Sequence, residues 1–371
     1  MTRDKQVLLI CDLGPPLPNH LLSVYERMGN TYVTLVRRRY GDLGPTRFRV
    51  IEVPLTVTVK KGNRLRTFAD LVSYLVIGSV VSLAASLRYR CTIVHSRFLV
   101  PEGVVGLVAS VFSHSALFVT AEGSDVNIHS RSPLVRAIIA MLASRGTILS
   151  VSMPIRARLS SMGIDSVYTP NFVDDSEFKF VPFDRKEHLL LFVGSLIEIK
   201  RPDILIDAVA SIPRELLPSD LKVRVVGVGP LESSIAGMIG ERGLQDMVSL
   251  EGTIPHSAVR DLMARALIYV STSAMEGTSF ALIEAMASGC VVIASDIPGN
   301  SAIVRDHENG LLFRQGDSAS LVRAMNEALN DRGLCERLAT SARRTFESNF
   351  DIASSAKLLS RLYAKTEAAV S

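Results

Sequence analysis

A short loop and the helix that follows it hold the residues best suited to do chemistry. The run Ile268–Thr272 has the composition of a buried strand, and a helical pattern begins at about Ser279. The first N–H groups of a helix lack partners within the helix, and the helix dipole is positive at that end. The backbone of Thr278, Ser279 and Phe280 is therefore suited to hold an anion such as a phosphate. Gly277 lets a ligand approach the backbone closely.

Two glutamates flank this anion site. Glu276 lies on the loop ahead of the helix, and Glu284 lies about one and a half turns into it. Two glutamates at this spacing could also be solvated residues of an exposed helix, but Gly289 ends the helix and another strand-like run follows. In that strand–loop–helix–Gly context, the carboxylates suit hydroxyl groups rather than phosphate. We expect them to bind the hydroxyls of a sugar and of a ribose.

Short apolar runs alternate with helical patterns along the chain, which predicts a parallel α/β architecture. A polar, Pro-containing seam at Phe180–Glu187 separates two Rossmann-like halves. The sequence predicts an N-terminal domain over 1–180 and a C-terminal domain over 186–350, with a last helix at about 351–371 that packs back on the first. The predicted strands are 7–12, 31–36, 49–53, 92–95, 116–120, 147–151, 167–169, 189–193, 223–228, 248–250, 268–272, 291–294 and 311–313. Ligands of such sheets sit beyond the carboxyl ends of the strands.

The segment Glu276-Gly-Thr-Ser-Phe-Ala-Leu-Ile-Glu284-Ala-Met-Ala-Ser-Gly289 resembles the Glu-x7-Glu signature of the retaining glycosyltransferases of family 4. Those enzymes have the GT-B fold, in which two Rossmann-like domains face each other across a cleft. Further stretches are similar to segments of the same family, in the same order: Thr169–Asp174, Val193–Ile206, Val226–Leu231 and Glu251–Pro255. The similarity covers residues 90–350 well and residues 1–90 by pattern alone.

The resemblance implies a role for each matching residue. Glu276 would contact the hydroxyls of the donor sugar, Glu284 would bind the ribose, and Lys200 would offset the charge that builds on the leaving diphosphate. The implied donor site also includes Gly14, Gly194, Ser195, Gly227, Ile254, Gly277, Thr278, Ser279 and Phe280. The backbone at 278–280 would hold the diphosphate, and Ile254 would sit against the base. Taken alone, Lys200 could be a surface lysine, and the Gly227 turn could be a tight strand–helix loop.

Phe172 replaces a glycine of the family pattern, and three further positions depart from it at the implied site. Ser195 stands where many members carry an arginine beside the phosphate, and we expect the Lys200-Arg201 pair to compensate for that cation. Glu122 replaces the histidine that usually lies near the donor sugar, so it is either a catalytic carboxylate or a structural one. Gly14 stands in a Pro-rich loop where the family has a Gly-rich one, and either approaches the phosphates or forms a plain turn.

The implied activity is transfer of a sugar from a nucleotide-diphosphate sugar, UDP- or GDP-linked, to a hydroxyl acceptor with retention at the anomeric carbon. The route assumed for the family is front-face: the departing phosphate takes the acceptor's proton, and the protein supplies positioning and electrostatics. No cofactor and no metal ion are expected. Two alternatives stay open: a catalytically inactive GT-B protein that serves as a binding or regulatory subunit, and a nucleotide-sugar epimerase on the same fold. The intact Glu276, Glu284 and Lys200 argue against the first.

Composition excludes several classes of protein. Apolar residues make up 47% of the chain and charged residues 21%, which is typical of a globular protein and not of a disordered one. The four cysteines, Cys11, Cys91, Cys290 and Cys335, form no CxxC pair. A disulfide framework or a zinc ribbon is therefore not expected, and a cytoplasmic location fits best.

Basic residues gather in the first half of the chain. Residues 1–175 hold 20 Lys and Arg against 12 Asp and Glu, with clusters at Arg37–Arg39 and Lys60–Lys61. A solvated face and attraction to anionic lipid both fit this charge, whereas nucleic acid is not expected, since no aromatic residues interleave. Leu71–Leu87 carries no charge over 17 residues but contains five Ser or Gly, which predicts a helix buried against the sheet. We expect a glycan or lipid-linked acceptor and peripheral contact with an anionic membrane.

Overall fold

The computed structural model describes residues 5–11, 17–28, 31–38, 48–53, 64–122, 126 and 132–370, and the side chains of all of these but 17–21, 38, 64–69 and 367–370. It divides the chain into two compact units. Unit 1 comprises Met1–Pro170 and Ile352–Ser371, and unit 2 comprises Asn171–Asp351. Each unit is built around its own parallel sheet.

Unit 1 ends at Pro170 and not at residue 180, where the sequence placed the boundary. The segment that follows packs on unit 2. The Val173 N–H donates to the Phe350 carbonyl at 2.9 Å, and the Val181 N–H donates to the Ser288 carbonyl at 3.2 Å. The side chain of Phe178 is buried in the core of unit 2. These contacts, rather than the Pro-containing seam, determine the boundary.

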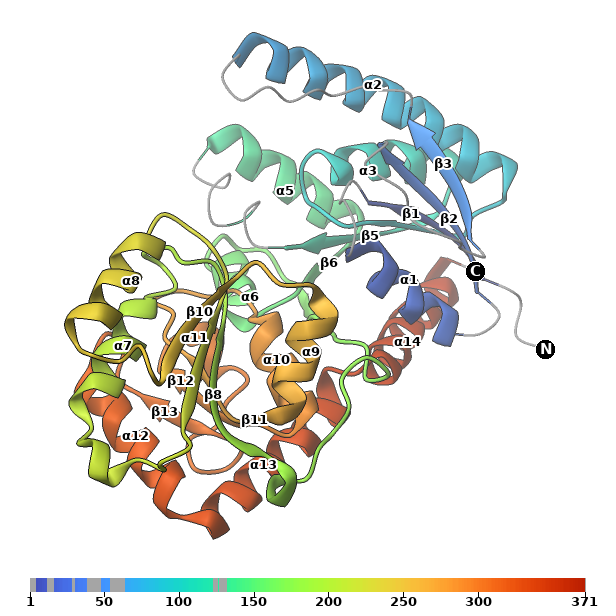
Figure 1. The fold of residues 1–371 in the computed structure, drawn as a ribbon. Helices are drawn as coiled ribbons and strands as arrows, with labels where there is room; N and C mark the ends of the chain where they lie inside the picture. The colour runs from blue at the N-terminus through green and yellow to red at the C-terminus, as the bar shows by residue number, and fades with distance from the viewer. Residues whose placement is uncertain are drawn as a thin grey trace. The chain divides into compact units, whose positions relative to one another are not determined.

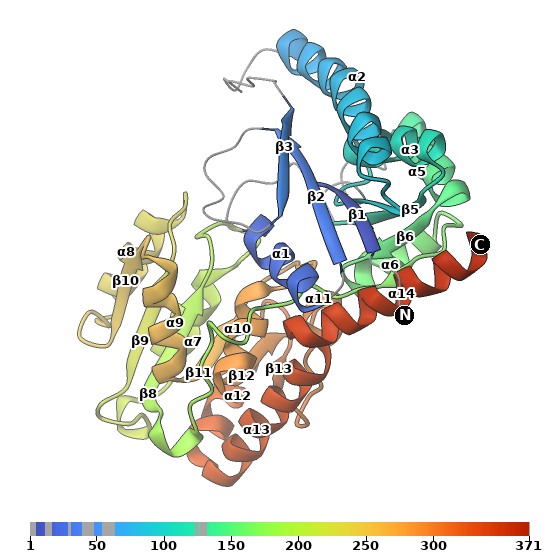
Figure 2. The ribbon, with the colours of Figure 1, turned by 90° about the vertical axis from the view of Figure 1, so that its right-hand side faces the viewer.

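The described residues of unit 1 form a seven-stranded parallel sheet with the order β3-β2-β1-β4-β5-β6-β7 (Figures 1 and 2). Its central strands are buried on both faces, which is why they read as continuous apolar runs rather than as alternating ones. The strands are β1 (Lys5–Ile10), β2 (Thr31–Arg38), β3 (Arg49–Val53), β4 (Ile93–Ser96), β5 (Ala116–Ala121), β6 (Thr147–Ser150) and β7 (Val167–Tyr168).

Helices cover both faces of this sheet. One face carries α2 (Arg64–Arg88), α3 (Glu102–Ser113) and α5 (Pro133–Arg145), with α3 packed between the other two (Figure 1). On the other face α1 (Leu17–Arg27) and α14 (Ile352–Val370) lie side by side. The helix α6 (Met153–Ser160) packs beside β6 and β7. The last helix of the chain thus belongs to unit 1.

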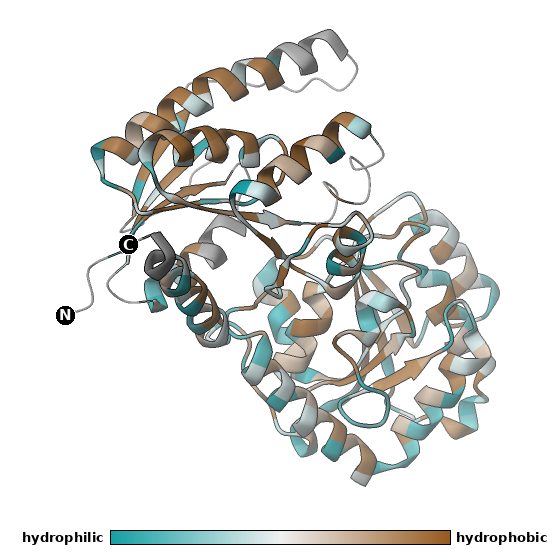
Figure 3. Cartoon of the chain, turned by 180° about the vertical axis from the view of Figure 1, so that it is seen from behind, coloured by the Kyte–Doolittle hydropathy of each residue, from teal (hydrophilic) through white to brown (hydrophobic). Residues whose placement is uncertain are grey.

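The helix α2 is only partly buried. Tyr74 and Ala85 face the core of unit 1, whereas Val76 and Val80 are 60% and 64% exposed. Its stretch Asp70–Arg88 has a mean hydropathy of 1.8 with 28% of it buried, and it alone among the described residues is long and apolar enough to cross a membrane. The expectation of a buried helix is therefore correct for one face only. We call the exposed apolar side chains of α2, α3 and α5 together the hydrophobic surface of unit 1. Figure 3 shows that these helices are hydrophobic along much of their length.

Unit 2 is built on a six-stranded parallel sheet with the order β10-β9-β8-β11-β12-β13. The helices α7, α8 and α12 cover one face, and α9, α10 and α13 pack on the other (Figure 1). The strands are β8 (Glu187–Val193), β9 (Lys222–Val226), β10 (Val248–Gly252), β11 (Ala266–Ser271), β12 (Val291–Ser295) and β13 (Leu311–Phe313). The helices are α7 (Pro202–Ser211), α8 (Glu232–Glu241), α9 (His256–Arg265), α10 (Phe280–Ser288), α11 (Pro298–Ser301), α12 (Ser318–Asn330) and α13 (Arg332–Asn349).

Each strand predicted from the sequence is present, with ends that differ by about two residues at most. In unit 2 the strands β8, β11 and β12 are neighbours, although they are far apart along the chain. Because all of them are parallel, their carboxyl ends meet at one edge of the sheet. The loops that leave these strands form the candidate site.

Candidate active site

The loop between β11 and α10 carries Glu276 and ends in a capped helix. The Ser279 side chain caps α10, because its Oγ accepts a hydrogen bond from the Leu282 N–H at 3.4 Å. Gly289 ends the helix in the left-handed conformation, with φ of 80°. The predicted helix start and helix end are thus confirmed. The first turn of α10 presents backbone N–H groups toward the space beside Glu276.

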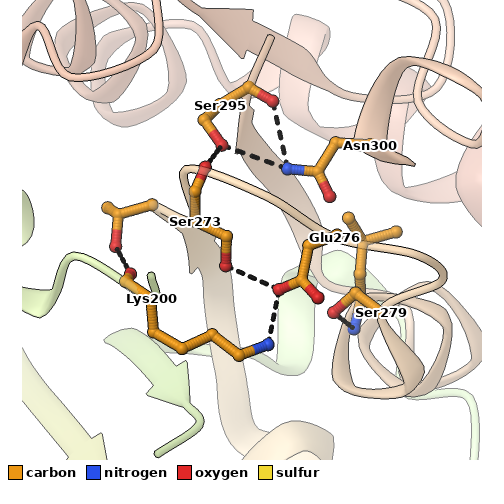
Figure 4. A network of polar contacts seen from close by, with 8 residues as sticks. Lys200, Ser273, Glu276, Ser279, Ser295 and Asn300 are labelled. Carbon is orange, nitrogen blue, oxygen red and sulfur yellow. Dashed lines mark hydrogen bonds and ion pairs between the residues drawn. The ribbon is translucent and has the colours of Figure 1, made fainter. Parts of the chain in front are cut away.

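Lys200 and Glu276 form an ion pair across two loops (Figure 4). The Lys200 Nζ lies 2.5 Å from the Glu276 Oε1, and the Ser273 Oγ donates to the same oxygen at 2.6 Å. The side chains of Lys200 and Glu276 are 28% and 10% exposed, so the pair is partly shielded from water. The sequence named both residues for separate roles, and the structure brings them into direct contact.

Backbone contacts hold the Lys200 loop against the Glu276 loop. The Thr272 Oγ1 donates to the Lys200 carbonyl at 2.8 Å. The Ala274 N–H donates to the Ile199 carbonyl at 2.7 Å. The backbone from which the Lys200 side chain extends is therefore held by the end of the neighbouring strand.

A buried polar network holds the loop that carries Glu276, and it was not predicted from the sequence. The Ser295 Oγ donates to the Ser273 carbonyl at 2.6 Å, and the Asn300 Nδ2 donates to the Ser295 carbonyl at 3.0 Å (Figure 4). Gly299 lies directly under the loop, since a Cβ there would stand 2.4 Å from the Glu276 carbonyl oxygen. The Gly299-Asn300 pair after β12 was a sequence signal for such a close approach.

Two of the predicted glycines differ in what they approach. A Cβ on Gly277 would meet nothing within 4 Å, so the loop is open to a ligand at this point. Gly227 has φ of 137°, and a Cβ there would stand 1.9 Å from the Gly194 carbonyl oxygen. The close approach at Gly227 is thus between two loops of the protein, and it allows the loop after β9 to pack on the loop after β8.

The second glutamate of the motif has a partner that the sequence analysis missed. Glu284 lies on α10 with its side chain 12% exposed, and its Oε1 lies 3.4 Å from the Nε2 of His256. His256 is the first residue of α9, directly after the loop that holds Ile254. Ile254 is partly buried against the core of unit 2. The structure therefore places Glu284, Ile254 and His256 in one part of unit 2.

The Lys200-Arg201 pair, expected to compensate for the missing arginine, has two different partners. Ser195 is exposed and carries no charge. Arg201 has φ of 48°, and its guanidinium donates to both carboxylate oxygens of Asp203, at 3.0 Å from Nε to Oδ1 and 2.8 Å from Nη2 to Oδ2. Because Asp203 neutralises Arg201, Lys200 is the cation of this segment that faces Glu276.

Glu122 lies in unit 1, directly after β5, and it forms an ion pair with Arg97. Both side chains are about nine-tenths buried, with 11% and 9% exposed. The structure therefore gives Glu122 a cationic partner at the end of the neighbouring strand. This contact is compatible with a catalytic role and with a structural one. Gly14 lies outside the described residues.

Near this ion pair His95 has a structural role. It is fully buried, and its ring nitrogens are hydrogen-bonded to Thr120 at 2.8 Å and to Tyr363 at 2.7 Å. Burial lowers the pKa of His95 to about 3, so the ring is neutral. Since Tyr363 lies on α14, this contact attaches the last helix to the sheet of unit 1. Within the described ranges, no group of three or more His, Cys, Asp or Glu side chains is arranged to hold a metal ion.

Comparison with known proteins gives similarity to glycosyltransferases. Residues 173–345 match the family model described as glycosyl transferases group 1. The match spans just under half of the chain. The match covers nearly the whole of unit 2, which contains the Lys200–Glu276 pair.

Among curated relatives, this glycosyltransferase is similar to the putative teichuronic acid biosynthesis glycosyltransferase TuaC of Bacillus subtilis (strain 168). The two are 26% identical over 287 residues, which is 73% of this chain and 70% of TuaC. Further curated relatives align over 36% to 42% of their own length. The alignment with TuaC is longer than either unit and therefore includes residues of both.

Solved structures confirm the GT-B fold of this glycosyltransferase. Sucrose-phosphate synthase from Thermosynechococcus elongatus superposes with a TM-score of 0.75 at 20% identity, over 98% of this chain and 100% of that one. Anabaena HepE, solved in complex with UDP-glucose, superposes with a TM-score of 0.72 at 19% identity, over 97% of this chain and 99% of that one. The predicted fold class, two Rossmann-like domains of the GT-B type, is therefore confirmed.

Proposed function

We propose that this glycosyltransferase moves a sugar from a nucleotide-diphosphate sugar to a hydroxyl acceptor, with retention at the anomeric carbon. The observation that supports this best is the Lys200–Glu276 ion pair beside the N-terminus of α10. A cation, a carboxylate and the N-terminus of a helix lie together at the carboxyl edge of one sheet. A diphosphate needs the first and the third, and the hydroxyls of a sugar need the second.

The donor is placed as follows in this proposal. The diphosphate lies at the N-terminus of α10, over the backbone of residues 277–280, which is open to a ligand at Gly277. Glu276 accepts hydrogen bonds from the sugar hydroxyls, and Glu284 accepts them from the ribose. UDP- and GDP-linked sugars are the proposed donors. The UDP-glucose complex of the structural neighbour HepE supports a nucleotide sugar as the ligand.

In the reaction, the bond between the anomeric carbon and the diphosphate oxygen breaks, and the acceptor oxygen bonds to that carbon on the same face. The acceptor's proton passes to the departing phosphate. Lys200 and the helix N-terminus stabilise the negative charge that develops on the diphosphate, so the proposal includes no metal ion and no cofactor. Lys200 must exchange part of its contact with Glu276 for the diphosphate when the donor arrives.

A thermal-shift panel tests the proposed donor. Wild type and Glu276→Ala are heated with UDP-, GDP- and ADP-linked sugars, because a ligand that binds only the folded state raises the melting temperature. We expect one donor class to raise the melting temperature of wild type by several degrees and to raise that of the variant much less. If no nucleotide sugar shifts wild type at any concentration up to about 100 times a typical donor KM, the inactive-subunit alternative replaces the proposal.

For the acceptor, we propose a lipid-linked or membrane-surface glycan, reached from the cytoplasmic face of a membrane. The hydrophobic surface of unit 1 supports this proposal (Figure 3). Its exposed apolar side chains are Leu71, Val72, Val76, Val80 and Leu87 on α2, Val111 and Phe112 on α3, and Leu134 and Met141 on α5. A patch of this kind on a protein surface marks an interaction site. The name of TuaC points to polysaccharide biosynthesis as the wider process.

Of the basic clusters named from the sequence, the structure describes the side chain of Arg37 alone. Arg37 is 3% exposed and pairs with Glu52 at 3.0 Å, so it is not free to contact lipid. Arg39, Lys60 and Lys61 lie outside the described residues. Exposed arginines lie on the same helices, with Arg88 as the last residue of α2 and Arg136 and Arg145 on α5.

The double variant Val76→Asp, Val80→Asp tests the membrane contact. Both side chains project from α2 away from the core, so the variant folds normally but places two negative charges on the hydrophobic surface. We expect the fraction that sediments with phosphatidylglycerol liposomes to fall at least about fivefold, since each apolar contact with lipid contributes on the order of 1 kcal/mol. Leu216→Asp is the matched control, because Leu216 is 59% exposed in unit 2. Equal sedimentation of the double variant and wild type would remove this surface from the proposal.

A further inference from the structure

His256 occupies a position that the stability of its own helix does not explain. It is the first residue of α9, and no side chain caps this helix, since Pro255 precedes it. A cation at a helix N-terminus opposes the helix dipole, and Ser, Thr or Asp would serve α9 better there. The contact that His256 makes lies on another helix, where its Nε2 stands 3.4 Å from the Glu284 Oε1.

Three charged groups and one ring surround the imidazole. Glu284 faces it from α10, Arg260 lies one turn further along α9, and Glu177 lies in the segment before β8. Arg260 and Glu177 pair with each other at 2.9 Å, so they largely cancel. The Phe178 ring meets His256 edge-on at a centroid distance of 5.8 Å, which restricts the orientation of the imidazole. Glu284 is therefore the charge to which His256 responds.

The carboxylate of Glu284 has one oxygen engaged and one available. Its Oε1 faces His256, and no hydrogen bond to its Oε2 is present among the residues that the structure describes. The side chain is 12% exposed, so a ligand can reach it. A carboxylate held on one side by a cation keeps its negative charge and a fixed orientation on the other side.

We propose that His256 is a positioning residue for the nucleotide: protonated, it holds Glu284 so that the second carboxylate oxygen accepts a ribose hydroxyl. This inference rests on the proposed function, which places the ribose at Glu284. It adds a residue of α9 to the donor site and makes donor affinity depend on pH.

The direction of the pH dependence follows from the contacts. The hydrogen bond with Glu284 raises the pKa of His256 above its ordinary value, while partial burial and Arg260 act in the opposite sense and Glu177 adds to the increase. The stabilising contact is therefore complete at acidic pH and is lost as the pH rises through this raised pKa. Donor binding is expected to weaken over the same interval.

Calorimetric titration with UDP and with GDP tests the inference in wild type, His256→Gln and His188→Gln at about pH 6.5 to about pH 9. Glutamine can still donate to Glu284, but it carries no charge. We expect the dissociation constant of His256→Gln to exceed that of wild type by about fivefold at the lowest pH and to approach it at the highest. This ratio is independent of the protonation of the nucleotide itself. His188, near the start of β8, is the matched control. Its side chain is 47% exposed, against 48% for that of His256, and it pairs with Asp220.

Two further measurements separate this inference from the proposed function. In an NMR titration, Glu284→Gln is expected to lower the pKa of His256, whether or not a nucleotide binds. Glu284→Ala is expected to abolish most of the binding of the nucleotide. If Glu284→Ala weakens binding and His256→Gln gives a ratio near one at every pH, the positioning role is wrong and the proposed function stands. If Glu284→Ala leaves binding unchanged, or neither nucleotide binds wild type, the proposed donor site is wrong and this inference fails with it.

Discussion

Glu276→Gln is expected to lower kcat/KM for sugar transfer by roughly 100- to 1,000-fold. The substitution keeps the shape of the side chain and removes its charge. It therefore replaces the charged acceptor of the sugar hydroxyls, which has two oxygens, by a neutral amide with one carbonyl oxygen. It also leaves the Lys200 ammonium without its counter-charge at 2.5 Å. Initial rates of transfer over a range of donor concentrations measure the effect.

Two controls distinguish a loss of catalysis at the site from a general loss of folding in Glu276→Gln. Glu336→Gln is the control, because Glu336 is an exposed glutamate on α13 in the same unit. We expect that variant to have wild-type rates. The melting temperature of Glu276→Gln without donor should stay within a few degrees of wild type, since the Ser273–Ser295–Asn300 network remains. Transfer at a wild-type rate by Glu276→Gln would show that this carboxylate has no part in the reaction.

Lys200→Met is expected to lower kcat by roughly 100-fold or more, with a smaller change in the donor KM. The methionine fills much of the space of the lysine stem but supplies no charge for the leaving diphosphate. Because the charge on the diphosphate is greatest in the transition state, the loss should appear mainly in kcat. Steady-state kinetics with the donor identified by thermal shift measure both parameters.

The contact between Lys200 and Glu276 also predicts the behaviour of the double variant Glu276→Gln, Lys200→Met. Because the two side chains contact each other, the free-energy losses of the two single variants, calculated from kcat/KM, should add to more than the loss of the double variant. Lys222→Met is the control, because Lys222 is an exposed lysine at the start of β9, on the opposite edge of the sheet. An equal loss in Lys222→Met would indicate a general effect of charge, and strict additivity would indicate that the two residues act independently.

The residues that hold the Glu276 loop in place are not the residues proposed to touch the ligand. Gly299 allows the loop to pack closely on α11, and Asn300 of α11 donates to Ser295 at the end of β12. The Oδ1 of Asn300 is buried without a hydrogen-bond partner in the described part of the chain. These residues match no catalytic or binding motif, yet their contacts hold the loop that carries Glu276 in place. Their role is visible only where the loops after β11 and β12 are seen together.

The sequence alone determined the features that depend on local patterns. The strands could be predicted because buried parallel strands are continuous apolar runs, and the start of α10 could be predicted because Ser279 is a capping residue followed by a helical period. The Glu276 and Glu284 positions followed from the same segment. The family resemblance added their roles, and the family match of unit 2 agrees with it.

The tertiary structure decided the contacts between residues far apart along the chain. Lys200 and Glu276 are separated by 76 positions, and they meet because β8 and β11 are neighbours in the sheet. The pairs His256–Glu284 and Arg97–Glu122, and the burial of Arg37 against Glu52, have the same origin. Hydrophobic periodicity specifies which segments become strands and helices, but the order of strands in the sheet depends on packing of the whole unit. That order places one side chain beside another, and so it determines which charges are available to a ligand.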